Sequence, residues 1–196
     1  GLQQLGYQVS ILKERDITEA NLKQFDAVIT GIRAYNVHPF LNQRYELLMN
    51  YVRNGGNLIV QYNTNSQFSP LNSRMGPYPF TISRTRVSDE KSPVQFALPN
   101  HPVLNYPNKI TANDFEGWIQ ERGIYFADKP DAKYAAPLLM YDPGEQPQNR
   151  SLIIGNYGKG VFVYTGLVFF RELPAGVPGA YRLLANIIAL NKKKGL

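Results

Sequence analysis

Two short apolar runs separated by the pattern of an amphipathic helix limit the possible folds of this chain more than any other feature. The runs cover residues 27–30 and 57–62, and both are the kind of β-branched segment that forms a strand buried on both faces. From Phe40 to Arg53 apolar residues recur at spacings of three and four, and Asn54-Gly55-Gly56 follows as a helix end. A strand, a helix and a strand with short connections require a right-handed parallel crossover. The sequence therefore predicts a doubly wound α/β sheet.

The first 25 residues predict one more strand and two helix ends. Gly6 is expected to end a helix, and residues 7–12 alternate in polarity as a strand does. Thr18 is expected to cap a short helix that carries Leu22 and Phe25. The chain starts within a pattern and without an initiator Met, so we expect it to be a fragment of a longer protein.

The remainder divides into an irregular middle and a regular end. Residues 63–150 are rich in Pro, Asn and Ser and predict a β/loop-rich insertion of short strands and turns at one end of the sheet. Residues 151–157 and 161–165 flank Gly158-Lys159-Gly160, which is typical of an antiparallel hairpin. Residues 181–190 predict a helix that packs on the sheet. With 196 residues, we expect a single domain, 1–196, that includes this insertion.

Composition excludes several classes of function. The chain has no cysteine, which rules out disulfides, thiolate metal sites and a Cys nucleophile. Two histidines, His38 and His101, argue against a multi-His metal site or a catalytic triad, so we expect no metal and no cofactor. The longest apolar stretch, residues 161–170, is interrupted by Gly166 and is shorter than the roughly 20 residues that a bilayer requires. We therefore expect no membrane insertion.

The net charge of +6 raises the question of a polyanionic partner. The basic residues are scattered, and the one run, residues 192–194, is expected to be a solvated helix end. We therefore expect no nucleic-acid partner. The alternative, polyanion binding, predicts steeply salt-dependent retention on heparin or DNA.

Several segments of the sequence resemble those of non-catalytic members of the class I glutamine amidotransferase-like fold. The resemblance to the fold lies in residues 25–31 (FDAVITG), 51–60 (YVRNGGNLIV) and 157–166 (YGKGVFVYTG). The last two of these are similar to trehalose-utilisation-type and galactosidase-associated domains of that fold. Two more closely resemble the C-terminal region of large bacterial PIG-L (LmbE-like) sugar deacetylases, namely residues 31–36 (GIRAYN) and 169–182 (FFRELPAGVPGAYR). The resemblance implies a flavodoxin-like, mostly parallel sheet with a C-terminal antiparallel hairpin. Together with the absence of cysteine, it favours an extracytoplasmic location, either periplasmic or secreted.

The residues required for catalysis in these families are missing here. An active amidotransferase carries a Cys nucleophile after the strand that follows the Gly-Gly pair, where this chain has residues 61–65 (QYNTN). Its catalytic His lies late in the chain, where residues 166–172 (GLVFFRE) hold none. Glutaminase activity is excluded because it needs both a thiolate and an imidazole. The zinc ligands of a deacetylase are also absent, so the resemblance implies a non-catalytic module whose partners are other domains of a zinc-dependent N-acetyl-sugar deacetylase.

Two constellations are candidate ligand sites. In open α/β sheets ligands bind beyond the carboxyl ends of the strands, where two polar loops contain Arg33, Tyr35, Asn36, Tyr62 and Asn63. The planar guanidinium of Arg33 is suited to an anionic or hydroxyl-rich ligand. The alternative is that Arg33 and Asn36 only tie the loop to the insertion.

The second constellation combines His101 with Asp114, Glu116 and Trp118. On a strand the two carboxylates at i and i+2 would face one side, as acid–base chemistry requires, and the indole would stack on a sugar. The alternative is that His101 is a turn residue and Trp118 a core residue. Two hypotheses follow: a carbohydrate-binding accessory module, and a cryptic hydrolase that uses Asp114, Glu116 and His101.

Overall fold

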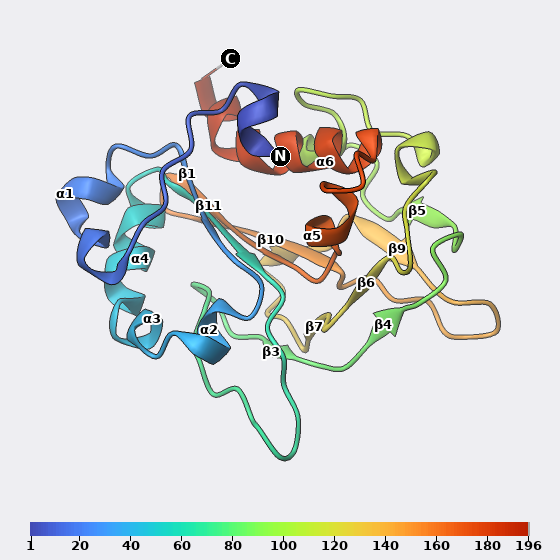
Figure 1. The fold of residues 1–196 in the computed structure, drawn as a ribbon, viewed down its shortest axis with the longest axis horizontal. Helices are drawn as coiled ribbons and strands as arrows, with labels where there is room; N and C mark the ends of the chain where they lie inside the picture. The colour runs from blue at the N-terminus through green and yellow to red at the C-terminus, as the bar shows by residue number, and fades with distance from the viewer. Residues whose placement is uncertain (196) are drawn as a thin grey trace.

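A five-stranded mixed sheet forms the centre of the molecule (Figure 1). The computed structural model describes residues 1–195, with side chains described as far as Lys192. The sheet has the order β1-β2-β11-β10-β8. Its strands are β1 (Ala27–Thr30), β2 (Asn57–Gln61), β8 (Tyr134–Ala135), β10 (Leu152–Tyr157) and β11 (Gly160–Thr165). The expected α/β class is confirmed, but the sheet is not mostly parallel: β1–β2 and β2–β11 are parallel, whereas β11–β10 and β10–β8 are antiparallel.

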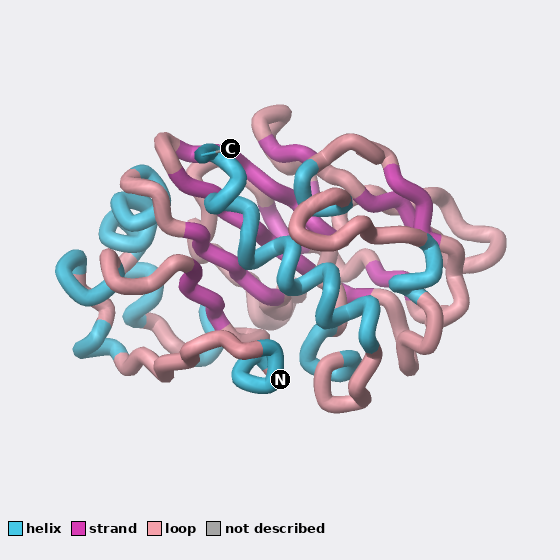
Figure 2. The backbone as a smooth tube through the Cα atoms, turned by 90° about the horizontal axis from the view of Figure 1, so that it is seen from above, coloured by secondary structure: helices cyan, strands magenta, loops and turns pink. Residues whose placement is uncertain are grey.

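Apolar cores lie on both faces of the sheet, because successive side chains of a strand point to opposite faces. On β2, Leu58 and Val60 join the cluster that contains α4 (Tyr45–Arg53), whereas Ile59 joins the cluster that contains α6 (Pro178–Ile188). The strand β11 alternates in the same way. Figure 2, which views the molecule from above, shows α6 lying over the strands of the sheet. The sheet is therefore covered by helices on both faces.

The unit from β1 to β2 has the expected parallel pairing with three differences in detail. Thr18 caps α1 (Glu19–Leu22) by accepting a hydrogen bond from the Asn21 N–H at 3.2 Å, but Phe25 lies beyond this helix. The expected helix from Phe40 to Arg53 is interrupted at Arg44 and forms α3 (Phe40–Gln43) and α4. In addition, β1 is an edge strand whose first three residues are only half-buried, so burial on both faces is wrong for it.

Residues 7–12 form no strand, contrary to the sequence pattern. The 3₁₀ helix η1 (Leu2–Leu5) ends at Gly6 as expected, with φ of 85°. The following residues belong to no strand and have no pairing partner, since β1 pairs only with β2. The side chain of Ile11 is 90% exposed. Alternating polarity describes the shape of a strand but does not supply the neighbouring backbone that a strand needs.

The insertion forms short strands and turns, as the sequence predicts, but it does not lie only at one end of the sheet, because its strand β8 is part of the central sheet. Three two-stranded ladders join β3 (Thr81–Ile82) to β7 (Ala127–Asp128), β4 (Arg86–Val87) to β6 (Gly123–Ile124), and β5 (Val94–Phe96) to β9 (Leu138–Met140). The remaining short helices are η2 (Glu14–Asp16), α2 (Ala34–Val37), η3 (Pro102–Leu104), η4 (Ala112–Phe115), α5 (Phe169–Glu172) and η5 (Ala189–Gly195). Apolar residues of the insertion, such as Val87, Val103 and Phe115, share the core under α6.

The C-terminal part is close to the expectation. The β10–β11 hairpin turns at Gly158, whose φ of 58° suits glycine, and α6 starts at Pro178, three residues before the expected start.

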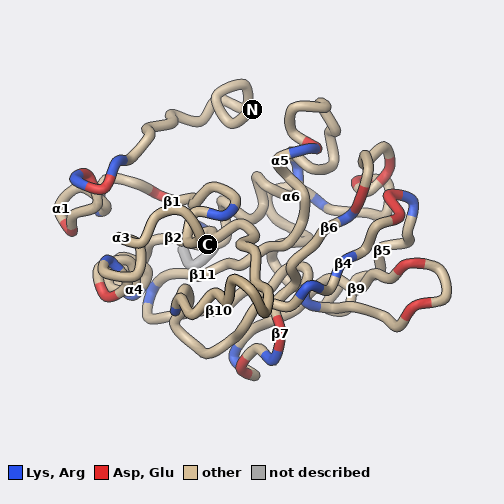
Figure 3. Tube along the Cα trace, turned by 60° about the horizontal axis from the view of Figure 1, so that its bottom comes forward, with Lys and Arg blue, Asp and Glu red and all other residues tan. Residues whose placement is uncertain are grey.

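In the described part of the chain, no helix is long and apolar enough to cross a membrane. Lys and Arg are interspersed with Asp and Glu along the trace (Figure 3), and Lys192 pairs with Asp26 at 2.8 Å. Lys193 and Lys194 lie outside the described side chains.

Candidate functional site

The loops that follow β1 and β2 are joined by their own polar groups at the carboxyl edge of the sheet. The backbone N–H of Arg33 donates to the carbonyl of Tyr62 at 2.8 Å. The amide of Asn36 bonds both backbone groups of Thr64, each at 2.9 Å. The fully buried Asn63 accepts a hydrogen bond from the N–H of Tyr35 at 2.9 Å. The two loops are therefore joined through Asn36 and Asn63. Because Thr64 belongs to the insertion, Asn36 has the role that was the alternative prediction, tying the loop to the insertion.

The ring of Tyr62 lies at the centre of an aromatic cluster at this edge. It stacks on Tyr125 with centroids 5.5 Å apart and an interplanar angle of 25°, and it meets Phe170 edge-on at 5.5 Å. Tyr125 comes from the insertion, where its carbonyl accepts the hydroxyl of the buried Tyr164 at 2.6 Å. Phe170 lies on α5, just after β11. Sequence reasoning singled out Tyr62 but missed Tyr125 and Phe170.

Two arginines and one glutamate surround this aromatic cluster. Arg33 is exposed, and Arg171 lies over the ring of Phe170 at 5.0 Å while its Nε contacts Oε1 of Glu121 at 3.2 Å. Burial raises the pKa of Tyr62, and the positive charges of Arg171 and Arg33 partly oppose that rise. Like any tyrosine hydroxyl, that of Tyr62 is protonated at neutral pH, so it can both donate and accept a hydrogen bond.

Unusual backbone conformations gather around the same cluster. In the described chain, four residues other than glycine have positive φ, and two of them, Arg33 and Tyr125, each at 58°, belong to the site. A third, Gln120 at 67°, precedes Glu121. Such conformations cost about 1–3 kcal/mol each and are enriched in ligand-binding segments. Tyr35, in contrast, is a buried core residue whose pKa is raised by burial.

The constellation around Asp114 is not the paired-carboxylate arrangement that the sequence suggested. Asp114 lies in the 3₁₀ helix η4 rather than on a strand, so the expected shared face is wrong. Its buried carboxylate accepts the N–H of Thr111 at 2.8 Å and the Nε–H of Arg182 at 2.7 Å. Glu116 follows the helix and is exposed. The two carboxylates therefore occupy different environments.

Trp118 and His101 have the structural roles that were the alternative prediction. The indole of Trp118 is 3% exposed, stacks on Phe115 at 5.5 Å and donates from Nε1 to the carbonyl of Asp114 at 3.0 Å. The Nδ1 of His101 accepts the N–H of Val103 at 3.1 Å and caps η3. Trp118 consequently presents no ring face at the surface on which a sugar could stack.

Two charged residues, one in the insertion and one on α5, are buried, which the sequence did not predict. Arg122 is 3% exposed and donates to the carbonyls of Ser92, at 2.9 Å from Nη2, and of Phe115. Glu172 is fully buried and accepts the N–H of Ile119 at 3.1 Å. Burial raises the pKa of Glu172 to about 7, against the lowering effect of the Ile119 N–H and the nearby arginines. No local pattern marks these residues, because their partners are distant in sequence.

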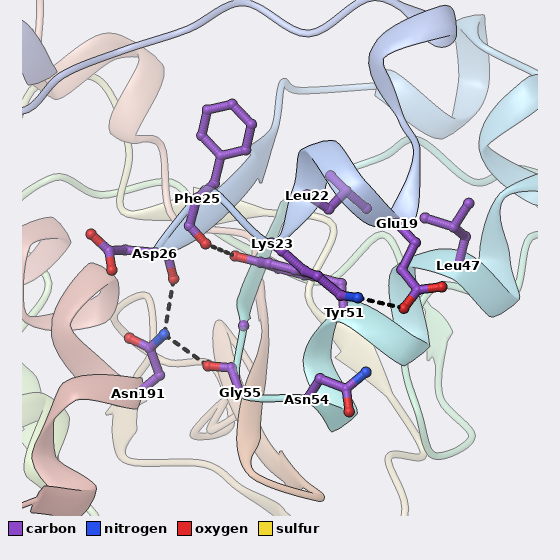
Figure 4. Close-up of a pocket in the computed structure, with 11 residues that line it drawn as sticks. Glu19, Leu22, Lys23, Phe25, Asp26, Leu47, Tyr51, Asn54, Gly55 and Asn191 are labelled. Atoms are coloured by element: carbon purple, nitrogen blue, oxygen red, sulfur yellow. Dashed lines mark hydrogen bonds and ion pairs between the residues drawn. The ribbon is translucent and has the colours of Figure 1, made fainter.

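A pocket of about 250 Å³ lies at the opposite edge of the sheet (Figure 4). Phe25 and Asp26 precede β1 there, and Gly55 precedes β2. Its polar groups bind one another: Tyr51 donates to the carbonyl of Phe25 at 2.9 Å, and Asn191 donates to those of Asp26 and Gly55 at 2.9 and 3.1 Å. Among the described residues, no group of three or more His, Asp or Glu side chains is placed to hold a metal ion.

Comparison with known proteins identifies similarity at the level of the fold. No family model matches the chain, and no curated protein matches it. The cytoplasmic protein STM1381 from Salmonella typhimurium LT2 matches with a TM-score of 0.60 at 12% identity, over 95% of this chain and 82% of that one. The cytoplasmic protein STM3548 from Salmonella typhimurium matches with a TM-score of 0.58 at 14% identity, over the same shares of the two chains. Because both neighbours are described as cytoplasmic, the expected extracytoplasmic location is corrected.

Proposed function

We propose that this chain is a non-catalytic module that binds a carbohydrate at the carboxyl edge of its sheet. The observation that carries the proposal is Tyr62, whose ring contacts those of Tyr125 and Phe170 and is only half-buried. Sugar rings pack their C–H faces on aromatic side chains, and their hydroxyls bind planar polar groups such as guanidinium. Arg33 and Arg171 provide such groups at the rim of the cluster.

We extend the proposal to the fold, which we take to be amidotransferase-like and flavodoxin-like. The phrases of the resemblance cover β1, the end of α4 with β2, and the turn with β11, and these three strands run parallel to one another. The two candidate loops follow β1 and β2 at their carboxyl ends, where doubly wound sheets bind ligands. On this proposal the module serves an LmbE/PIG-L-like sugar deacetylase by holding its substrate or packing against its catalytic domain.

The absence of a nucleophile at the proposed site favours binding over catalysis. After β2, where an amidotransferase places its Cys, this chain has Tyr62 and Asn63, and the amide of Asn63 is engaged with the neighbouring loop. The competing hydrolase hypothesis rests on Asp114, whose carboxylate is held by Arg182 and Thr111. No observation favours that alternative.

Calorimetric titration with N-acetylglucosamine tests the proposal. We expect the wild-type chain to bind and Tyr62→Ala to lose about tenfold or more in affinity, which corresponds to about 1.4 kcal/mol. The matched control is Tyr157→Ala, which removes a half-buried tyrosine at the far end of β10 and leaves affinity unchanged. Equal binding by wild type and Tyr62→Ala, or no binding of any saccharide by the wild type, would overturn the proposal.

A further inference from the structure

The proposed site has more positive charge than a neutral sugar would use. Arg171 shares its charge with Glu121, since Nε and Oε1 are 3.2 Å apart. Arg33 makes no ion pair with any residue that the structure describes, and its side chain is exposed. The nearby buried Glu172 has its pKa raised to about 7 and so is partly neutral at physiological pH. The rim of the cluster therefore has a net positive charge centred on Arg33.

The backbone holds Arg33 in a fixed place beside the aromatic cluster. Its φ of 58° is a conformation that L-residues with long side chains rarely adopt, and its N–H is bound to the carbonyl of Tyr62 at 2.8 Å. Tyr62 itself packs on Tyr125 and Phe170. The side chain of Arg33 therefore extends from backbone that is bonded to a well-packed residue of the aromatic cluster. A fixed backbone with a free guanidinium suits the binding of an anionic group on a ligand that stacks on Tyr62.

We propose that the ligand of this site is a sugar that carries a carboxylate, and that Arg33 binds that carboxylate while the ring packs on the Tyr62 cluster. This inference rests on the proposed function. The planar fork of a guanidinium matches the two oxygens of a carboxylate, and such paired, charge-assisted hydrogen bonds are stronger than those between neutral groups. The net charge near Tyr62 adds a longer-range attraction for the acidic sugar.

The test compares three sugars on the wild-type chain at equal ionic strength: glucuronic acid, N-acetylglucosamine and glucose 6-phosphate. We expect glucuronic acid to bind about tenfold more tightly than N-acetylglucosamine. Raising the salt concentration from about 50 to 500 mM is expected to reduce this preference, because exposed charges are screened. In Arg33→Gln the ratio of the two affinities is expected to approach one, and Arg33→Lys is expected to keep part of the preference because it keeps the charge. Arg53→Gln, at an exposed arginine on α4, is the control that keeps the wild-type ratio.

The outcomes separate this inference from the function on which it rests. If N-acetylglucosamine binds as tightly as glucuronic acid, the carboxylate preference is wrong and the binding function stands. If glucose 6-phosphate binds more tightly than glucuronic acid, the site selects a phosphate and the inference is overturned. If none of the three sugars binds, the proposed function fails and this inference fails with it.

Discussion

The segments around Asp114 and around Tyr62 contain similar residues but differ in how many of their polar groups remain available. Around Asp114, the carboxylate is taken up by Thr111 and Arg182, and the indole N–H of Trp118 binds a backbone carbonyl. Around Tyr62, the ring is half-buried, and Arg33 extends into solvent from a strained backbone. The first cluster therefore stabilises the fold, and the second is where we propose that a ligand binds.

The comparison shows that residue types alone do not distinguish a site from a core. Both segments contain an aromatic ring, an arginine and a carboxylate. They differ in how many of their polar side chains already have hydrogen-bond or ion-pair partners, because a buried polar group must find its partners inside the protein. An exposed guanidinium without an ion pair, beside strained backbone, is the combination that indicates binding.

The largest effect is expected from Trp118→Ala, which should lower the free energy of unfolding by about 3–5 kcal/mol because it leaves a cavity in the core. Urea denaturation measures this loss. Trp118→Phe, a milder change, should remain folded and should bind sugar like the wild type. A tenfold loss of sugar affinity in folded Trp118→Phe would mean that this cluster, not the Tyr62 cluster, is the site.

The buried Glu172 is expected to make stability depend on pH. Its pKa is raised to about 7 in the folded chain from an ordinary value of 4.5, so its contribution to stability is fully present below pH 4.5 and is lost as the pH rises to about 7. The Glu172→Gln variant should lack this decline, which amounts to roughly 3 kcal/mol at the usual cost per pKa unit. Urea denaturation across this pH range measures it, with the exposed Glu116→Gln as the control. An unchanged slope in Glu172→Gln would contradict the burial of a carboxyl at this position.

Asn63→Ala is expected to loosen the two loops at the carboxyl edge. It leaves the buried N–H of Tyr35 without its 2.9 Å acceptor, which should cost about 1–3 kcal/mol of stability. Amide hydrogen exchange of Tyr35 should become faster, and sugar affinity should fall with it. Unchanged exchange at Tyr35 would show that Asn63 does not join the loops.

The smallest effect on stability is expected from Arg33→Asn. Asparagine tolerates the left-handed conformation of this residue better than arginine does, so stability should be retained or rise by up to about 1 kcal/mol. Sugar affinity should nevertheless fall, most clearly for an acidic sugar. A variant that is less stable yet binds normally would assign Arg33 a structural role, and the distinction between the two regions would no longer hold.

Much of the fold was predictable because its signals are local. Short segments indicate the elements directly: the apolar runs at β1 and β2, the Gly-Lys-Gly turn and the periodicity of α6. Residues 7–12 show the limit of this reasoning, since a pattern indicates a strand but not the neighbour with which it pairs. The edge position of β1 is set by strand order, which no local pattern states, and the antiparallel pairing of β10 with β8 depends on a strand that the insertion contributes.

The candidate site was only partly predictable for the same reason. Arg33 and Tyr62 follow strands directly, so topology placed them at one edge. Tyr125 lies in the insertion and Phe170 on α5, and no local sequence pattern indicates that they contact Tyr62. The strand expected at Asp114 and Glu116 was wrong, because Thr111 and Asp114 are spaced as a helix-capping pair.

The central claim is that the carboxyl edge around Tyr62 binds the ligand. Its most direct test is a titration of the isotopically labelled chain with glucuronic acid, followed by amide chemical shifts. We expect saturable shifts at residues 33–36, 61–65, 125 and 170, with residues 112–118 unaffected. Shifts confined to residues 112–118, or to the pocket at Phe25, Asp26 and Gly55, would contradict it.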